Sequence, residues 1–175
     1  VGSEMCIRDS TNCELKIAST AIDIFKKALR VAEKNAQLHK VNRKIKFIQS
    51  NLLSNVKSLN ADIVIANLPY LSKERRNKLS KDISFEPASA LFAGQNGLQL
   101  IDKLLKQISV LLKINYARAR DKQPLAKEKS KFILLEIGYG QKDKIRSKIK
   151  KNFTNVKIKF IKDLLGIDRV AIVEI

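Results

Sequence analysis

Apolar and polar positions along the chain follow the order typical of alternating strands and helices. The run from Glu14 to Ile22 predicts a strand that ends at Asp23, and apolar positions at helical spacing from Phe25 to Ala36 predict an amphipathic helix. A short strand is expected over residues 44–49. The run from Ile63 to Ala66 is apolar at both alternating sets of positions, which is typical of an interior strand in a parallel sheet covered on both faces.

The second half of the chain continues the alternation. A polar, basic stretch over residues 71–96 is long enough to be a substrate loop. The patterns then predict a helix from Leu98 to Leu112, a solvated connection over residues 116–131, a strand over residues 132–137 and a basic helix over residues 142–152. Apolar residues alternate with lysines over residues 156–160, and residues 169–175 are the expected antiparallel partner.

Asn67, Leu68, Pro69 and Tyr70 directly follow the continuous apolar strand. Ligands bind just outside the carboxyl ends of strands in open α/β sheets, so this tetrapeptide is a candidate site. The Asn67 side-chain oxygen and the Leu68 carbonyl can each accept one hydrogen of a planar –NH2 group, while Tyr70 packs against its plane. Asn and Pro are also ordinary turn residues, so a purely structural role stays open.

Asn-Leu-Pro-Tyr after such a strand resembles the Asn-Pro-Pro-Tyr motif of amino-group methyltransferases that use S-adenosylmethionine. The segment from Phe85 to Leu98 resembles the corresponding part of the glutamine methyltransferases that modify peptide chain release factors, and residues 135–141 and 163–170 also resemble that family. The resemblance covers residues 11–175. It implies an α/β fold with a Rossmann-like class I methyltransferase sheet, mostly parallel with an antiparallel C-terminal strand.

The resemblance implies S-adenosylmethionine as the cofactor and gives its contacts. Asp23 matches the acid that accepts the ribose hydroxyls, with Ile24 beside it; a helix N-cap is the competing interpretation of Asp23. Asn51 and Leu52 match the residues at the adenine, where the family usually has an acid and an apolar or aromatic residue. Asn51 keeps an acceptor oxygen but has lost the charge. Asn67 is expected to border both cofactor and substrate.

The implied reaction is methylation of a glutamine side-chain amide in a release factor that carries a Gly-Gly-Gln loop. The expected substrate contacts lie in two segments: Asn67, Leu68, Pro69 and Tyr70, and Phe85, Glu86 and Pro87. The family has proline at the position of Leu68, so the carbonyl is retained and some rigidity is lost. Asn-Leu-Pro-Tyr also occurs in ribosomal RNA adenine dimethyltransferases, which are the first alternative; a non-catalytic basic RNA-binding fragment is the second.

The N-terminal part departs from the family. Residues 1–10 fit neither the family nor a regular pattern, so we interpret them as a non-native leader, with a natural N-terminal arm as the alternative, and residues 11–175 as a partial methyltransferase domain. No glycine-rich loop precedes Asp23 to hold the methionine end of the cofactor. We therefore expect the first strand and its loop to be missing, and this chain to bind S-adenosylmethionine weakly or not at all.

Composition changes this picture little. The 175 residues include 35 Lys and Arg against 17 Asp and Glu, a net charge of +18 that would suit contact with RNA or the ribosome. The basic residues are spread along the chain, so charge alone decides nothing. Two cysteines without metal-binding spacing are compatible with the reducing cytoplasm. No apolar run approaches the ~18–20 residues that a membrane span needs.

Overall fold

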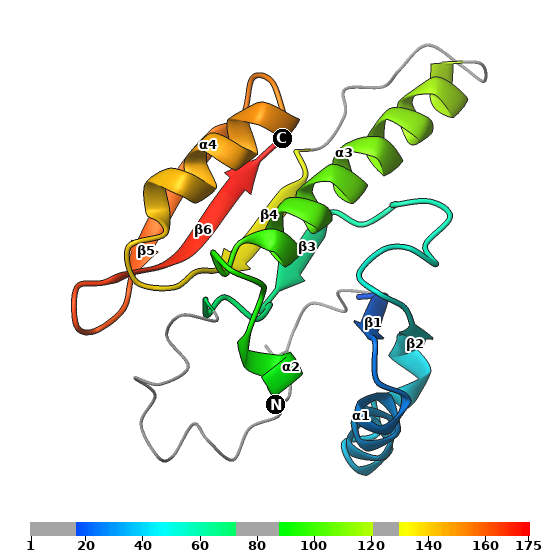
Figure 1. The fold of residues 1–175 in the computed structure, drawn as a ribbon. Helices are drawn as coiled ribbons and strands as arrows, with labels where there is room; N and C mark the ends of the chain where they lie inside the picture. Colours follow the sequence, from blue (N-terminus) through cyan, green and yellow to red (C-terminus); the bar gives the residue numbers. More distant parts are fainter. Residues whose placement is uncertain (1–16, 73–87, 121–129) are drawn as a thin grey trace. The chain divides into compact units, whose positions relative to one another are not determined.

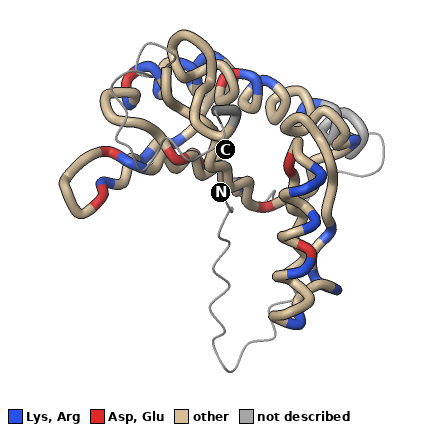
Figure 2. The backbone as a smooth tube through the Cα atoms, turned by 60° about the horizontal axis from the view of Figure 1, so that its bottom comes forward, with Lys and Arg blue, Asp and Glu red and all other residues tan. Residues whose placement is uncertain are grey.

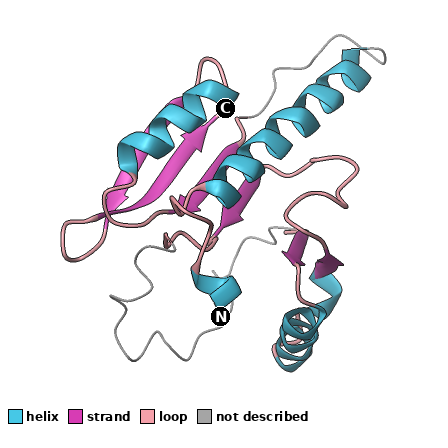
Figure 3. Cartoon of the chain, viewed as in Figure 1, coloured by secondary structure: helices cyan, strands magenta, loops and turns pink. Residues whose placement is uncertain are grey.

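The computed structural model describes residues 17–72, 88–120 and 130–175 (Figures 1 and 3). The chain divides into two compact units, one ending at Lys57 and the other running from Ser58 to Ile175. Each unit has its own sheet and is described separately.

The first unit is a β–α–β arrangement. Strand β1 (Ser19–Asp23) is followed by α1 (Lys26–Leu38), a 3-10 turn (Asn42–Lys44) and β2 (Ile45–Gln49). The two strands are parallel, with Asp23 opposite Gln49, so both carboxyl ends lie at the same edge. Leu29 and Ala36 form the buried stripe of α1. The predicted strand and helix are confirmed, and the two connected strands bring residues 23–25 beside residues 50–52.

Two details of this unit differ from the sequence prediction. The strand begins at Ser19 rather than Glu14; Ile17 and Ala18 are not in it, and residues 14–16 lie outside the described part. Phe25 was predicted on the buried face of the helix, but its side chain is 50% exposed. Phe25 is the cap that precedes the first helical residue, so the helical periodicity does not set the direction of its side chain.

The second unit has a four-stranded sheet in the order β3–β4–β6–β5. The strands are β3 (Ile63–Ala66), β4 (Phe132–Glu136), β5 (Lys157–Lys162) and β6 (Asp168–Glu174). Strand β3 pairs with β4 in parallel, and β6 pairs antiparallel with both β4 and β5. The predicted antiparallel return at the C-terminus is therefore confirmed, and its insertion beside β4 makes β4 a central strand.

Helices α3 (Gln99–Arg120) and α4 (Lys142–Asn152) pack against each other and against this sheet (Figure 1). Alternate sheet residues beneath them are at most 1% exposed, and so are the helix residues that meet them. This core consists of Ile133, Leu135, Ala171 and Val173 from the sheet, Ile101, Leu105 and Ile108 from α3, and Ile145 and Ile149 from α4. Apolar burial here fixes the orientation of β4 and therefore of the loop that follows it.

The prediction that Ile63–Ala66 is an interior strand covered on both faces is wrong for the described residues. Strand β3 lies at the edge of its sheet and pairs only with β4 there. Ile63 is 54% exposed and Ile65 is 65% exposed. The alternate residues Val64 and Ala66 are partly covered. Helices α3 and α4 cover one face of this sheet, so the alternate residues of β3 on the other face stay accessible.

The connections also differ from the prediction. Helix α3 continues to Arg120, so residues 116–120 are helical instead of part of a solvated connection. The run Ala-Arg-Ala-Arg at residues 117–120 has high helix propensity, and Pro124, which would end a helix, lies beyond it. Of the predicted substrate loop over residues 71–96, the structure describes both ends, including a short helix α2 (Ala88–Leu91).

Lysine and arginine positions recur along most of the described elements (Figure 2). Several are paired with acids: Lys106 and Lys148 both contact Asp102, and Lys142 contacts Asp168. The described residues therefore show a dispersed basic charge that is partly neutralised within the fold. None of the described helices is both long enough and apolar enough to cross a membrane.

Candidate functional site

The tetrapeptide from Asn67 to Tyr70 leaves the carboxyl end of β3, where the sequence predicts the site. The Asn67 side chain is exposed, and neither its amide nor the Leu68 carbonyl has a hydrogen-bond partner among the described residues. Two acceptor oxygens are therefore available next to each other in sequence. They follow the end of β3, which is hydrogen-bonded in parallel to the central strand β4.

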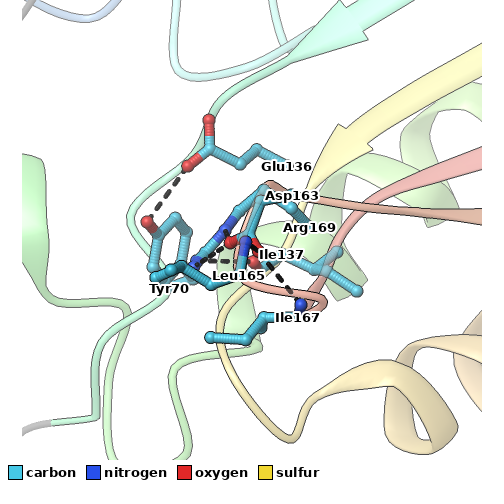
Figure 4. Close-up of polar contacts among 7 residues, drawn as sticks. All are labelled: Tyr70, Glu136, Ile137, Asp163, Leu165, Ile167 and Arg169. Carbon is cyan, nitrogen blue, oxygen red and sulfur yellow. Dashed lines mark hydrogen bonds and ion pairs between the residues drawn. The ribbon is translucent and has the colours of Figure 1, made fainter.

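Tyr70 is fixed through its hydroxyl group (Figure 4). The hydroxyl donates a hydrogen bond of 3.0 Å to Glu136 Oε1 at the end of β4. Burial raises the pKa of Tyr70, and the charge of the Glu136 carboxylate and its hydrogen bond raise it further, whereas the Arg169 charge acts in the opposite direction. Tyr70 is thus a neutral hydrogen-bond donor at physiological pH, with its ring held in one orientation.

The main chain of Tyr70 is fixed as well. Gln141 Nε2 donates to the Tyr70 carbonyl at 2.9 Å, and Gln141 Oε1 accepts from the Gly138 N–H at 2.8 Å. The single Gln141 side chain therefore bridges the loop after β3 and the loop after β4. A Cβ atom added at Gly138 would lie 2.9 Å from Tyr70 Cδ2, so the ring packs directly on this glycine.

The next residues close the predicted substrate loop. Leu71 forms an isolated parallel bridge with Phe92: the Leu71 N–H donates to the Leu91 carbonyl at 3.0 Å, and the Ala93 N–H donates to the Leu71 carbonyl at 3.1 Å. Gly97 follows with a φ of +66°, and a Cβ there would lie 2.1 Å from the Tyr70 carbonyl oxygen. The segment that resembles the release-factor enzymes thus packs on the main chain of the candidate site.

Gly97→Ala tests this packing. We expect it to lower the free energy of unfolding by about 1–2 kcal/mol for the positive φ and by about another 1–3 kcal/mol for overpacking against Tyr70. Gly140→Ala is the matched control, because its φ is +74° and nothing lies within 4 Å of the added Cβ. Urea unfolding of both variants measures the difference. Equal destabilisation would contradict a close approach of Gly97 to the motif.

A second cluster lies beside Tyr70 and Glu136 (Figure 4). Arg169 at the start of β6 donates to Asp163 Oδ2 from Nε at 3.2 Å and from Nη2 at 3.0 Å, and to the Ile137 carbonyl at 3.4 Å. Asp163 Oδ1 also accepts from the Leu165 and Ile167 N–H groups, each at 3.0 Å. Asp163 therefore shapes the β5–β6 loop and orients Arg169, which acts on the Tyr70–Glu136 pair.

The acid sensitivity of this cluster can be predicted. The hydrogen bond from the Ile167 N–H is the first cause that lowers the pKa of Asp163 below its ordinary value of 3.8, and Arg169 contributes to the same shift. Because the folded pKa is depressed, the stabilisation is present above pH 3.8 and is lost as pH falls through the folded pKa.

Asp163→Asn should consequently lower the thermal unfolding midpoint at neutral pH, and the difference from the unsubstituted chain should shrink as pH falls below 3.8. Asp143→Asn is the control, because Asp143 is 87% exposed and has a single ion pair, with Arg146. Thermal unfolding followed by circular dichroism from neutral to acid pH measures both. A difference independent of pH would exclude a role for the Asp163 charge.

The predicted cofactor residues lie in the first unit. Asp23 Oδ1 accepts from the Phe25 N–H at 2.7 Å, and its other oxygen has no hydrogen-bond partner among the described residues. The helix N-cap interpretation of Asp23 is wrong, because the cap of α1 is Phe25 and makes no side-chain cap bond. The Ser50 N–H donates to the Asp23 carbonyl at 3.0 Å, which places Asn51 beside Asp23.

These residues fit a nucleoside. Four predicted residues lie at the carboxyl ends of the parallel strands β1 and β2. Asp23 offers a carboxylate oxygen and Asn51 is exposed, while Ile24 (49% exposed) and the partly covered Leu52 supply apolar side chains. Gln49 Nε2 donates to the Ile24 carbonyl at 3.2 Å and steadies the turn after β1. Acceptors for hydroxyl or amino hydrogens thus lie beside apolar surface, the combination expected of a site for a ribose and a base.

Within each unit the predicted residues lie near one another: Asp23, Ile24, Asn51 and Leu52 form one group in the first unit, and residues 67–70 form another in the second. Phe85, Glu86 and Pro87 lie outside the described residues, and so does the predicted leader. Three residues that contact or influence Tyr70 were not predicted as site residues from the sequence: Glu136, Gln141 and Arg169. Their signal was present, since residues 135–141 and 163–170 were among the segments that carry the resemblance.

Comparison with known proteins supplies independent information. Residues 4–85 match the family model described as "RMKL-like, methyltransferase domain". The release factor glutamine methyltransferase of Francisella tularensis is 34% identical over 150 residues, which are 85% of this chain and 46% of that protein. The enzyme of the same name from Bacillus subtilis is 33% identical over 153 residues, 86% of this chain and 47% of that protein. The chain spans about half the length of these curated relatives.

Solved structures agree on the fold. A Clostridium thermocellum protein assigned as an rRNA methylase has a TM-score of 0.55 at 11% identity, covering 90% of this chain and 74% of that one. The catalytic domain of hMettl16, solved with an RNA hairpin, has a TM-score of 0.51 at 11% identity and covers 89% of this chain and 54% of that one. At such identities the likeness shows the fold alone. The predicted α/β methyltransferase fold and the resemblance to the release factor enzymes are confirmed.

Proposed function

We propose that this chain, a methyltransferase homologue of the release factor glutamine methyltransferases, carries the substrate-orienting site of an enzyme that methylates a glutamine side-chain amide in a peptide chain release factor. One observation carries the proposal. Two acceptors without a hydrogen-bond partner among the described residues, the Asn67 side-chain amide oxygen and the Leu68 carbonyl, follow β3 directly. They precede a tyrosine that is fixed at both its hydroxyl and its carbonyl. Residues 11–175 would form part of the catalytic domain.

The chemistry explains why orientation matters. An amide nitrogen is a poor nucleophile because its lone pair is delocalised into the carbonyl group. In the proposed complex, Asn67 and the Leu68 carbonyl accept the two amide hydrogens, and the Tyr70 ring packs against the plane of the amide. The nitrogen is then presented with one face towards the methyl donor. Such positioning can supply up to about 7–11 kcal/mol of a barrier.

S-adenosylmethionine, the methyl donor of this class of enzymes, supplies an electrophilic methyl group on a sulfonium. Asp23 would accept hydrogen bonds from the ribose hydroxyls through Oδ2, the oxygen that the Phe25 N–H does not use. Asn51 would accept one from the adenine amino group, and Ile24 and Leu52 would pack on the ring. Asn67 is the residue proposed to border both ligands. The match to a methyltransferase family supports this cofactor.

Proton removal needs no strong base in this scheme. The methylated amide nitrogen carries positive charge, so it loses its proton readily after transfer. The residues of the site therefore act by binding and orienting. The substrate side of the site is proposed to be completed by Phe85, Glu86 and Pro87. Because a release factor acts in translation, the cytoplasm is the proposed location of the reaction.

The small number of aromatic residues near the motif favours a glutamine side chain over an adenine as the substrate. An adenine flipped out of RNA needs aromatic walls that replace its lost base stacking. Tyr70 and Phe85 are the aromatics nearest the motif in sequence, which is little for a purine and enough for an unbranched amide side chain. The lysines and arginines of the described residues are spread over most elements and several are paired with acids, so their charge does not by itself favour RNA over protein.

A labelling experiment tests the proposal. The full-length protein that contains this sequence is incubated with S-adenosylmethionine labelled in the methyl group, together with a release factor or with ribosomal RNA. We expect label on the release factor only. Label on ribosomal RNA adenine with none on the release factor would overturn the proposal in favour of the RNA adenine methyltransferase.

A further inference from the structure

We propose that Glu136 and Gln141 are positioning residues for methyl transfer, because they hold Tyr70 by its hydroxyl and by its carbonyl and thereby set the geometry of the Asn67–Tyr70 motif. This inference rests on the proposed function of that motif. Neither residue has to touch the substrate. Glu136 is the last residue of β4, and Gln141 is the residue that caps the start of α4.

Glu136 is well placed for this role because its own backbone is immobilised. It is the last residue of β4, pairs with Val170 of β6, and follows Leu135, which is fully buried. Its carboxylate accepts the Tyr70 hydroxyl at 3.0 Å, with the Arg169 guanidinium close enough to influence both groups. The hydrogen bond to Glu136 thus fixes the position of the tyrosine ring relative to β4, the central strand, and not only relative to its own loop.

Gln141 fixes the other end of the same residue. Its side-chain amide donates to the Tyr70 carbonyl and accepts from the Gly138 N–H, so both of its polar ends are used. The Ile145 N–H donates to the Gln141 carbonyl at 2.9 Å, and the buried Ile145 holds the first turn of α4 against the sheet. The bridge therefore connects the motif to a rigid helix.

Two attachment points matter because β3 is short and lies at the edge of the described sheet. Its four residues pair only with β4 there, and Asn67, Leu68 and Pro69 make no hydrogen bond to other described residues that would hold them in place. Leu68 also lacks the rigidity that proline would give at that position. Fixing Tyr70 at both ends restricts the acceptors that precede it, and displacements of about 1 Å can cost 10²-fold in rate.

The test compares shape-matched variants in the full-length protein that contains this sequence. Glu136→Leu removes the acceptor, and Glu136→Gln keeps an acceptor oxygen. We expect Glu136→Leu to lower kcat for methyl transfer to a release factor by about 10- to 100-fold, as for a lost hydrogen bond to a charged group. We expect Glu136→Gln to recover most of that loss, and the KM for S-adenosylmethionine to stay unchanged in both.

A double-mutant cycle with Tyr70→Phe separates positioning from general damage to the fold. If Glu136 acts through the Tyr70 hydroxyl, Glu136→Leu has little further effect on kcat once Tyr70 is phenylalanine. Independent, multiplicative losses would overturn the proposal for Glu136. Gln141→Glu, which keeps the acceptor for Gly138 and removes the donor to Tyr70, should lower kcat, whereas exposed Asp143→Asn should not. Equal kcat for these two variants would overturn the proposal for Gln141.

The chain itself provides a readout that does not depend on activity. Urea unfolding of the same Tyr70 and Glu136 single and double variants should show a non-zero coupling between the two sites. Coupling in unfolding without any transfer to a release factor would mean that the proposed function fails while the attachment of Tyr70 stands. No coupling in unfolding would contradict the attachment itself, whatever the substrate.

Discussion

Asn67→Ala is expected to reduce the rate of methyl transfer by about 10²-fold or more, because removing one positioned polar contact commonly costs about 2.7–4 kcal/mol of transition-state stabilisation. The Asn67 amide has no hydrogen-bond partner among the described residues, so its removal leaves no buried group of the protein unpaired. We therefore expect folding and cofactor affinity to stay close to those of the unsubstituted protein. Single-turnover kinetics and calorimetric titration with S-adenosylmethionine measure the two quantities.

Asn67→Asp is the matched variant, because it keeps an acceptor oxygen at the same distance from the main chain. It should retain more activity than Asn67→Ala if accepting an amide hydrogen is the task of this side chain. Turnover by Asn67→Ala within about threefold of the unsubstituted protein, well below the loss expected for a positioned contact, would show that Asn67 is only a turn residue.

The largest effect is expected on the substrate side. Replacing the glutamine of the Gly-Gly-Gln loop by alanine in a release factor should abolish labelling, because alanine has no side-chain nitrogen to accept the methyl group. Replacement by asparagine should also lower labelling strongly. Its amide is one methylene shorter and cannot reach the same two acceptors, whose position is fixed through Tyr70.

Labelling of the alanine variant at the level of the unsubstituted release factor would place the modification elsewhere. The methylated residue would then lie outside the Gly-Gly-Gln loop. The proposal that the glutamine of this loop reaches the acceptors of the Asn67–Tyr70 motif would be wrong. A release factor with an alanine substitution outside the loop provides the control for effects on docking.

The sequence predicted most elements because their patterns are local. The basic helix over residues 142–152 has the bounds of α4. The alternating apolar and lysine positions at residues 156–160 predicted the strand observed as β5, which runs from Lys157 to Lys162. Strand β3 was located correctly but assigned the wrong environment. An apolar run shows that a strand can be buried on both faces, but what covers each face depends on which other segments pack there, and here Ile63 and Ile65 stay exposed.

The site could be predicted only in part for a related reason. Asn67 to Tyr70 are consecutive, so a motif identifies them. Glu136 and Gln141 lie 66 and 71 residues beyond Tyr70 in the chain, and only the pairing of β3 with β4 brings them to it. The role of Gly97 was equally hidden, because its contact is with the carbonyl oxygen of Tyr70 rather than with a side chain.

The most direct test of the central claim is to locate the methyl group by tandem mass spectrometry of peptides from the release factor after reaction with the full-length protein. The central claim predicts a gain of one methyl group on the side-chain nitrogen of the glutamine in the Gly-Gly-Gln loop, formed about 10²-fold more slowly when Asn67 is alanine. A methyl group on a different side chain, or on ribosomal RNA adenine with none on the release factor, would contradict it.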